Sequence, residues 1–193
     1  ARMLVRPFDR MTEADWTGLL QVNLTGTFLG CKAAADRMTA GSRIINISSA
    51  HGLVASPYKS AYVTAKHGIT GFTKTVALEA AQNGVTVNAI CPGYVLTPLV
   101  EKQIPETAAA RGITEEAVKR DVLLAAQWTK KFVTVEQLAG VALFLCSDAA
   151  ENITGVRVSK AFAREGEQMN RFGNQNRRNL DANMSTAAVQ SVS

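Results

Sequence analysis

The chain has 193 residues, 47% of them hydrophobic, and a formal net charge of +5, which suits one domain with a sizeable core. Its apolar runs are short and interrupted, and its first residues lack an apolar core, so the sequence predicts neither a membrane span nor a signal peptide. Cys31, Cys91 and Cys146 are far apart among apolar neighbours, as expected for reduced cysteines of a cytoplasmic protein.

The first predicted element is one helix over residues 12–38. Thr12, with Asp15 three residues later, is typical of a capped helix start. Apolar side chains recur every three or four residues along this stretch and predict a buried stripe. The stripe consists of Trp16, Leu20, Leu24, Phe28, Cys31, Ala35 and Met38.

Strands and helices then alternate. The sequence predicts a strand over 43–49, a helix over 57–83 and a strand over 85–90. Residues 99–128 are expected to form a lid of mixed helix over the substrate, and residues 134–147 a further helix. This alternation predicts an α/β fold with a parallel sheet.

The candidate catalytic residues are Ser49, Tyr62 and Lys66. Tyr62 and Lys66 are four residues apart on the predicted helix, so the ammonium is expected to lower the pKa of the phenol and let it exchange a proton with a substrate oxygen. Ser49 falls at the carboxyl end of a strand, where α/β sheets bind ligands. Each residue alone would more often be structural, but the three together indicate a redox active site.

Several phrases around these residues match one known family. They are Ile44-Ile45-Asn46-Ile47-Ser48-Ser49, Lys59-Ser60-Ala61-Tyr62, Ala65-Lys66-His67-Gly68 and Asn88-Ala89-Ile90-Cys91-Pro92-Gly93. The sequence resembles the short-chain dehydrogenase/reductase family from about residue 8 to Gly155. The resemblance implies a Rossmann-like doubly wound parallel sheet, NAD as cofactor and a homo-oligomer, dimer or tetramer, paired through the helices over 12–38 and 57–83.

The resemblance also implies residue roles. Tyr62 is then the acid/base, Lys66 its partner and a ligand of the cofactor ribose, Ser49 the group that orients substrate, and Asn23 the holder of a water in a proton relay. The implied cofactor-binding residues are Tyr62, Lys66, Pro92, Gly93, Val95 and Thr97.

On the substrate side, His51, Lys59 and Gln103 match positions that hold a small carboxylate. With Ser49 and Tyr62, which act on the substrate oxygen, they are the implied substrate-binding residues. The implied reaction is the interconversion of 3-hydroxybutyrate and acetoacetate. Tyr94 stands where relatives more often have Trp, and an effect on lid packing is expected. Two histidines and no cysteine pair at ligand spacing predict that there is no metal site.

One part of the family pattern is not found. The glycine-rich turn that cradles the cofactor pyrophosphate has no counterpart, since Gly26 and Gly30 lie within a predicted helix and Lys32 stands at the third glycine position. We therefore expect the second half only of the sheet, with an open edge at the strand near Ile44. The alternative function is a catalytically inactive dehydrogenase fragment that acts at most as an association partner.

The end of the chain differs from the rest. Residues 156–193 carry 6 Lys/Arg and 3 Asp/Glu, a balance of +3, and have no apolar period. We expect a partial dehydrogenase domain over 1–155 and a polar, basic tail over 156–193 that is disordered or weakly helical. Nucleic-acid binding by this tail is less favoured than a solvated segment without a role.

Overall fold

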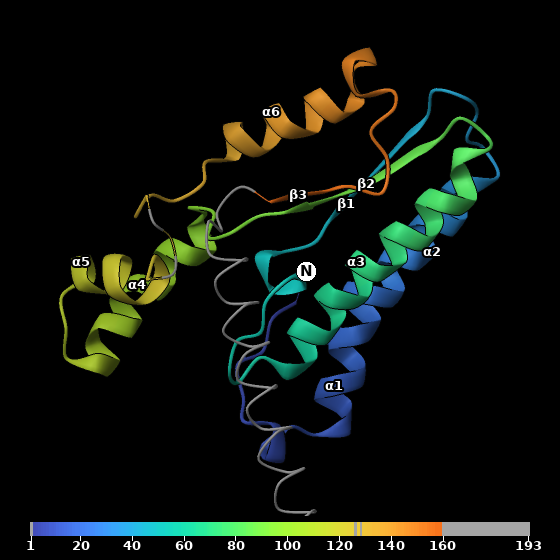
Figure 1. Ribbon diagram of the computed structural model, residues 1–193. Coiled ribbons are helices and arrows are strands. Elements are labelled where there is room, and N and C mark those ends of the chain that lie inside the picture. The colour runs from blue at the N-terminus through green and yellow to red at the C-terminus, as the bar shows by residue number, and fades with distance from the viewer. Residues whose placement is uncertain (1, 126, 128, 160–193) are drawn as a thin grey trace, which may run out of the picture. The chain divides into compact units, whose positions relative to one another are not determined.

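The computed structural model describes residues 2–125, 127 and 129–159. In this part of the chain, β1 (Arg43–Ile47), β2 (Thr86–Cys91) and β3 (Arg157–Ser159) form a parallel sheet in the order β1-β2-β3. Helices α2 (Gly26–Ala35) and α3 (Ser60–Ala81) lie on one face and α6 (Val135–Cys146) on the other (Figure 1). The predicted α/β class with a parallel sheet is confirmed.

The predicted helix over 12–38 is interrupted. Helix α1 (Glu13–Leu20) starts with the expected capping box, in which Asp15 N donates to Thr12 Oγ1 over 3.1 Å. A π-helical turn, Gln21–Thr25, then separates α1 from α2. A π turn adds a residue per turn and rotates the side chains that follow, so one stripe at helical spacing cannot stay on one face. Accordingly, Trp16 is 37% and Phe28 44% exposed, and the buried face centres on Leu19 and Asn23 instead.

The middle of the chain follows the prediction closely. β2 is buried along its whole length and pairs with β1 from Arg43↔Thr86 to Ile47↔Ile90. Helix α3 packs small and β-branched residues against the sheet and α1, among them Ala65 and Ile69. Within the described residues β1 pairs only with β2, and Ile47 is 57% exposed, as expected for an open edge.

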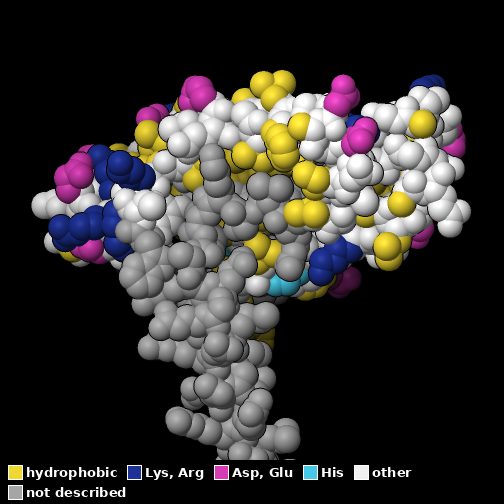
Figure 2. Space-filling view, turned by 45° about the horizontal axis from the view of Figure 1, so that its top comes forward, with side chains coloured by type: hydrophobic (Ala, Val, Ile, Leu, Met, Phe, Trp, Pro, Cys, Tyr) yellow, Lys and Arg dark blue, Asp and Glu magenta, His cyan; other side chains and the backbone are white. Residues whose placement is uncertain are grey.

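The mixed helix predicted over residues 99–128 is found, and we call this region the lid. It consists of α4 (Pro98–Arg111), the short α5 (Glu115–Ala117) and a π-helical turn, Val118–Leu123. Ile104, Val118 and Leu124 are buried in this region. Its outer surface carries charged pairs such as Lys119–Glu116 and Arg120–Asp121, and charges of both signs gather at this end of the molecule (Figure 2).

The sheet continues beyond Gly155, where the sequence predicts the domain to end. The backbone N–H of Gly155 donates to Val87 O over 2.8 Å, and Arg157–Ser159 then pair with β2. The expectation that the tail is disordered falls on residues 160–193, which lie outside the described part of the chain. No helix of the described part is long and apolar enough to span a bilayer.

Candidate active site

Ser49, Tyr62 and Lys66 meet at the carboxyl end of β1. The strand ends at Ile47, and Ser49 follows as the first residue of a tight turn whose helical part is Ala50–Gly52. Ser49 is 9% exposed, and its Oγ accepts a hydrogen bond from His51 N over 3.2 Å. Its side chain also hydrogen-bonds that of Tyr62. The turn after β1 therefore brings the hydroxyl of Ser49 to the phenol on α3.

Lys66 lies one helical turn after Tyr62 and joins α3 to the strand. Its Nζ donates to Ile47 O over 3.0 Å and lies 5.7 Å from the centroid of the Tyr62 ring. The residue is only 4% exposed, so its ammonium sits in a water-poor position beside the phenol. The predicted constellation of Ser49, Tyr62 and Lys66 is thus a compact cluster in space.

Gly52 allows the close contact between the turn and α3. A side chain at this position would place its Cβ 2.5 Å from Ser48 Oγ, 2.7 Å from Lys66 O and 2.8 Å from Thr70 Oγ1. The same carbonyl of Lys66 accepts from Ser48 Oγ and Thr70 Oγ1, each over 3.0 Å. Sequence reasoning missed Gly52, because a glycine after a strand usually indicates only a turn.

The pKa of Tyr62 shifts in the direction opposite to the expectation. Burial raises the pKa of Tyr62, the hydrogen bond with Ser49 lowers it, and Tyr94 raises it, with a net rise. The prediction that Lys66 would lower this pKa is wrong for this structure, since burial outweighs the favourable contacts. Burial also lowers the pKa of Lys66, against a smaller opposing effect of Cys91. Tyr62 is therefore a neutral phenol, and a proton donor, at neutral pH.

His51 and Lys59 lie beside this cluster. The His51 ring is 5.9 Å from the Tyr62 ring, centroid to centroid, in an edge-on arrangement. Burial, with the charges of Lys59 and His67, lowers the pKa of His51 to about 4, so its imidazole is neutral at neutral pH. Lys59 immediately precedes α3, and burial lowers its pKa. The third predicted carboxylate ligand, Gln103, belongs to α4, but its side chain lies outside the described part.

Asn23 belongs to the π-helical turn and is 4% exposed. Its amide is engaged on both sides, because Arg2 N donates to Oδ1 over 2.8 Å and Nδ2 donates to Arg2 O over 2.6 Å. The Asn23 carbonyl accepts from Thr27 Oγ1 over 2.8 Å. The side chain therefore fixes the segment at Arg2, and the expected water ligand would have to be held by the carbonyl.

The predicted cofactor segment forms the loop after β2. Pro92 O accepts from Ala50 N over 2.8 Å, which ties the loop to the turn that carries Ser49. Val95 pairs with Val133 of the segment before α6. Thr97 caps α4, and its Oγ1 accepts from Val100 N over 3.4 Å. The loop thus connects the catalytic cluster with the lid.

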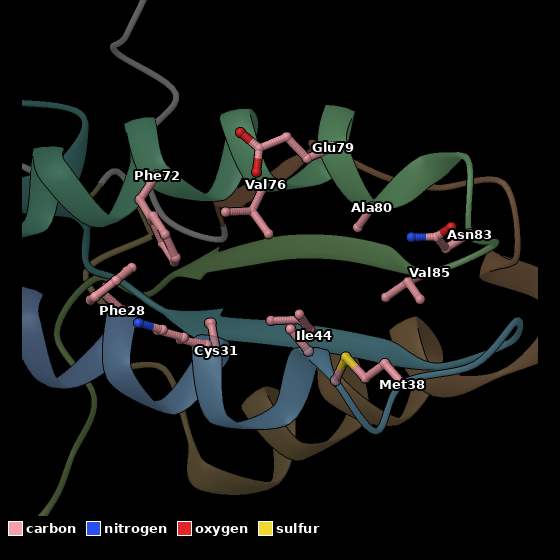
Figure 3. A pocket seen from close by; sticks show the side chains of 12 residues that line it. Phe28, Cys31, Met38, Ile44, Phe72, Val76, Glu79, Ala80, Asn83 and Val85 are labelled. Carbon is pink, nitrogen blue, oxygen red and sulfur yellow. The ribbon is translucent and has the colours of Figure 1, made fainter.

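A separate cavity of about 340 Å³ lies between α2 and α3. Phe28 and Phe72 meet edge-on at its end, with ring centroids 6.1 Å apart, and Ile44 and Val85 form its floor (Figure 3). None of the predicted catalytic residues lines it. Among the residues that the structure describes, no group of three or more His, Cys, Asp or Glu side chains could hold a metal ion.

Comparisons with known proteins agree with this geometry. Residues 1–159 match the sequence family described as "Enoyl-(Acyl carrier protein) reductase". The chain is 62% identical over 147 residues to D-beta-hydroxybutyrate dehydrogenase of Rhizobium meliloti (strain 1021), covering 75% of this chain and 57% of that protein. It is 51% identical over 142 residues to a protein of the same name from Cupriavidus necator (strain ATCC 17699 / DSM 428 / KCTC 22496 / NCIMB 10442 / H16 / Stanier 337), covering 72% and 55%.

The fold is shared with solved structures. One of them, 4-hydroxyisoleucine dehydrogenase complexed with NADH, superposes with a TM-score of 0.73 at 26% identity, covering 83% of this chain and 63% of that one. The chain spans a little over half the length of the two curated relatives.

Proposed function

Because the chain belongs to the short-chain dehydrogenase/reductase family, we propose that it carries the catalytic site of an NAD-dependent oxidoreductase that interconverts 3-hydroxybutyrate and acetoacetate. The observation that carries the proposal is the meeting of Ser49, Tyr62 and Lys66 at the end of β1, with the His51 ring beside them. The names of the two curated relatives support the choice of substrate.

Tyr62 has the proton-transfer role in this proposal. In the reductive direction its neutral phenol gives a proton to the ketone oxygen as that oxygen gains negative charge. Ser49, which hydrogen-bonds Tyr62, donates to the same oxygen and orients it. In the oxidative direction the phenolate takes the proton of the substrate hydroxyl. The raised pKa of Tyr62 makes the phenol, the form that reduction requires, the main form at neutral pH.

The residues of this chain fit the nicotinamide-ribose end of a dinucleotide. The Lys66 ammonium has three donors, and within the described residues Ile47 O is its one hydrogen-bond acceptor. A buried ammonium with two unused donors is costly unless a ligand supplies oxygens, as ribose hydroxyls would. Bound NAD(H) supplies or accepts the hydride. Pro92, Gly93, Val95 and Thr97 would line the nicotinamide side, and the NADH-bound relative supports NAD as the cofactor.

The carboxylate of the substrate would be held by Lys59, His51 and Gln103. Lys59 supplies a half-buried positive charge, and neutral His51 supplies a hydrogen-bond donor without a second charge. Asn23 is proposed to hold a relay water through its carbonyl. A steroid or an acyl thioester has no anionic group that would use the buried cation of Lys59.

A substrate panel tests the proposal. NADH formation from NAD⁺ is measured with D-3-hydroxybutyrate, with a hydroxysteroid and with a 3-hydroxyacyl thioester. Turnover of the hydroxy acid alone, with a KM raised about tenfold or more in Lys59→Met, is expected because the variant loses a charged contact. Turnover of the steroid or thioester, but not of 3-hydroxybutyrate, would overturn the substrate assignment.

The cavity between α2 and α3 favours a second candidate function, association with another copy of the fold. Phe28, which lines the cavity, is 44% exposed, and elsewhere on the two helices Leu29 and Leu78 are 51% and 79% exposed. Exposed apolar side chains of this kind are typical of interaction surfaces. Co-elution of the chain with an intact relative, lost in Leu78→Lys, would support this function, and separate elution would exclude it.

A further inference from the structure

Two buried hydroxyls hold the backbone of Lys66. Ser48 Oγ donates to Lys66 O over 3.0 Å, and Thr70 Oγ1 donates to the same carbonyl, also over 3.0 Å. The two hydroxyl oxygens lie 3.4 Å apart. Ser48 and Thr70 are 4% and 5% exposed, so water does not compete for these hydrogen bonds. We call Ser48 Oγ and Thr70 Oγ1 the hydroxyl pair.

The end of β1 contacts Lys66 at two points. Ile47 O accepts from Nζ over 3.0 Å, and Ser48 Oγ binds the backbone carbonyl. Ser48 is itself fixed, because its N–H donates to Ile90 O of β2 over 2.8 Å. Consecutive residues of the chain therefore hold the ammonium and the backbone of one lysine. A long side chain held at both ends has little freedom to move, which keeps the ammonium beside the Tyr62 ring.

The turn that carries Ser49 packs against the hydroxyl pair. A Cβ added to Gly52 would lie 2.5 Å from Ser48 Oγ and 2.8 Å from Thr70 Oγ1. Gly52 N donates to Ser49 O over 2.8 Å, so this glycine belongs to the same turn as the hydroxyl of Ser49. The hydroxyl pair thus lies where the end of β1, the turn and α3 meet.

A second buried contact joins β1 to α3 farther along the helix. Asn46 Nδ2 donates to Thr73 Oγ1 over 3.0 Å, and Thr73 Oγ1 donates to Ile69 O over 2.8 Å. Asn46 and Thr73 are 6% and 1% exposed. Thr73 therefore resembles Thr70 in type, burial and bonding to the carbonyl four residues earlier, but neither of these hydrogen bonds involves Lys66.

We propose that Ser48 and Thr70 are positioning residues of the site: their hydroxyls, acting through the carbonyl of Lys66, hold the ammonium of that residue beside the Tyr62 phenol. This inference rests on the proposed function. It assigns to the hydroxyl pair an effect on the rate of the reaction more than on the binding of substrate, because the carboxylate is held by other side chains in that proposal.

Thr70→Val and Thr73→Val form a matched pair for the test, with reduction of acetoacetate by NADH as the readout. Thr73→Val should be destabilised at least as much as Thr70→Val, since Asn46 Nδ2 loses its partner. We expect Thr70→Val and Ser48→Ala to lower kcat about tenfold or more with little change in KM, because a displacement of about 1 Å can cost about 10²-fold in rate. Thr73→Val should keep the wild-type kcat. Thr70→Ser retains the hydroxyl and should keep it too.

The pKa of Lys66 tests the inference without turnover. It is followed by NMR of the lysine side chains, with the Lys66 signal assigned by Lys66→Met. Burial lowers this pKa below 10.5 in the wild type. Water reaches a less tightly held ammonium more easily, so the pKa should rise toward 10.5 in Ser48→Ala and Thr70→Val and stay unchanged in Thr73→Val.

The results separate the inference from the proposed function. Wild-type kcat and an unchanged Lys66 pKa in Thr70→Val, or equal changes in Thr70→Val and Thr73→Val, would overturn the positioning role while the proposed function stands. A folded wild type without turnover would overturn the proposed function, and the pKa of Lys66 would still decide whether the hydroxyl pair holds this residue. Thr70→Val decides the matter where Ser48→Ala does not fold.

Discussion

Lys66 and Tyr62 are linked by more than their spacing on α3: the ammonium lies 5.7 Å from the centre of the phenol ring while Nζ donates a 3.0 Å hydrogen bond to Ile47 O. One side chain thus connects the helix that carries the acid/base with the last residue of β1. Because Lys66 is 4% exposed, this arrangement keeps a charge in a poorly hydrated position. The free-energy cost of burying this ammonium makes the stability of the fold depend on pH.

The stability of the fold should depend on the protonation of Lys66. Burial lowers its pKa below 10.5, so the unfolded chain binds more protons in the interval between the lowered pKa and 10.5. The free energy of unfolding should therefore rise with pH through that interval. Urea denaturation of the wild type and of Lys66→Met measures this slope, which the variant should lose. A wild-type slope that persists in Lys66→Met would exclude Lys66 as its source.

Acid should destabilise the fold through His51. Its pKa is lowered from 6.5 to about 4, so the unfolded chain takes up a proton first as the pH falls, and stability is lost between pH 6.5 and about 4. After an allowance for solvent screening, we expect a loss of about 1–2 kcal/mol from this group. His51→Asn should flatten the pH dependence of the melting temperature in this range, and an unchanged pH dependence would exclude His51 as its source.

Gly52→Ala should destabilise the fold and disturb the site together. The new Cβ would fall within 2.8 Å of Ser48 Oγ, Lys66 O and Thr70 Oγ1, and the two hydrogen bonds that Lys66 O accepts from these hydroxyls must shift. Overpacking of this kind costs about 1–3 kcal/mol. Gly71→Ala is the control, because nothing lies within 4 Å of its added Cβ and alanine favours a helix, so this variant should gain about 0.5–1 kcal/mol. Equal melting temperatures for the two variants would contradict the packing argument.

Gln127→Met should stabilise the chain. Gln127 is 4% exposed, and among the residues that the structure describes neither its Oε1 nor its Nε2 has a hydrogen-bond partner. Replacing an unpartnered buried amide by an apolar side chain of similar length removes a penalty of about 1–3 kcal/mol. Gln82→Met, at the exposed end of α3, should change the melting temperature little. A destabilised Gln127→Met would mean that this amide has a partner in solution.

Local sequence patterns predicted most helices and strands. The features that these patterns did not predict depend on contacts between residues far apart in the sequence. The capping box of Thr12 and Asp15 and the spacing of Tyr62 and Lys66 depend on neighbours in sequence, and both are found in the structure. The π-helical turn around Asn23 has no local signal, since its amide is fixed by the distant Arg2. The pairing of Val95 with Val133 joins two segments that are far apart in the sequence, and periodicity cannot reveal it.

The pKa of Tyr62 is another property that local sequence patterns do not predict. The sequence places Lys66 one turn away and predicts a lowered value, but the depth at which a side chain is buried depends on the whole fold. Burial is the largest cause of the rise in this pKa. The four-residue spacing therefore predicts that Lys66 and Tyr62 are neighbours, but it does not predict the net direction in which the pKa of Tyr62 shifts.

The most direct test of the central claim is the oxidation of NADH by acetoacetate, followed for the folded wild type and for Tyr62→Phe. Phenylalanine keeps the ring beside Lys66 and His51 and removes only the hydroxyl that gives the proton. We predict turnover by the wild type and a fall of about 10²–10⁴-fold in Tyr62→Phe, the usual contribution of a positioned acid/base. Undiminished turnover in Tyr62→Phe, or none by a folded wild type, would contradict the account.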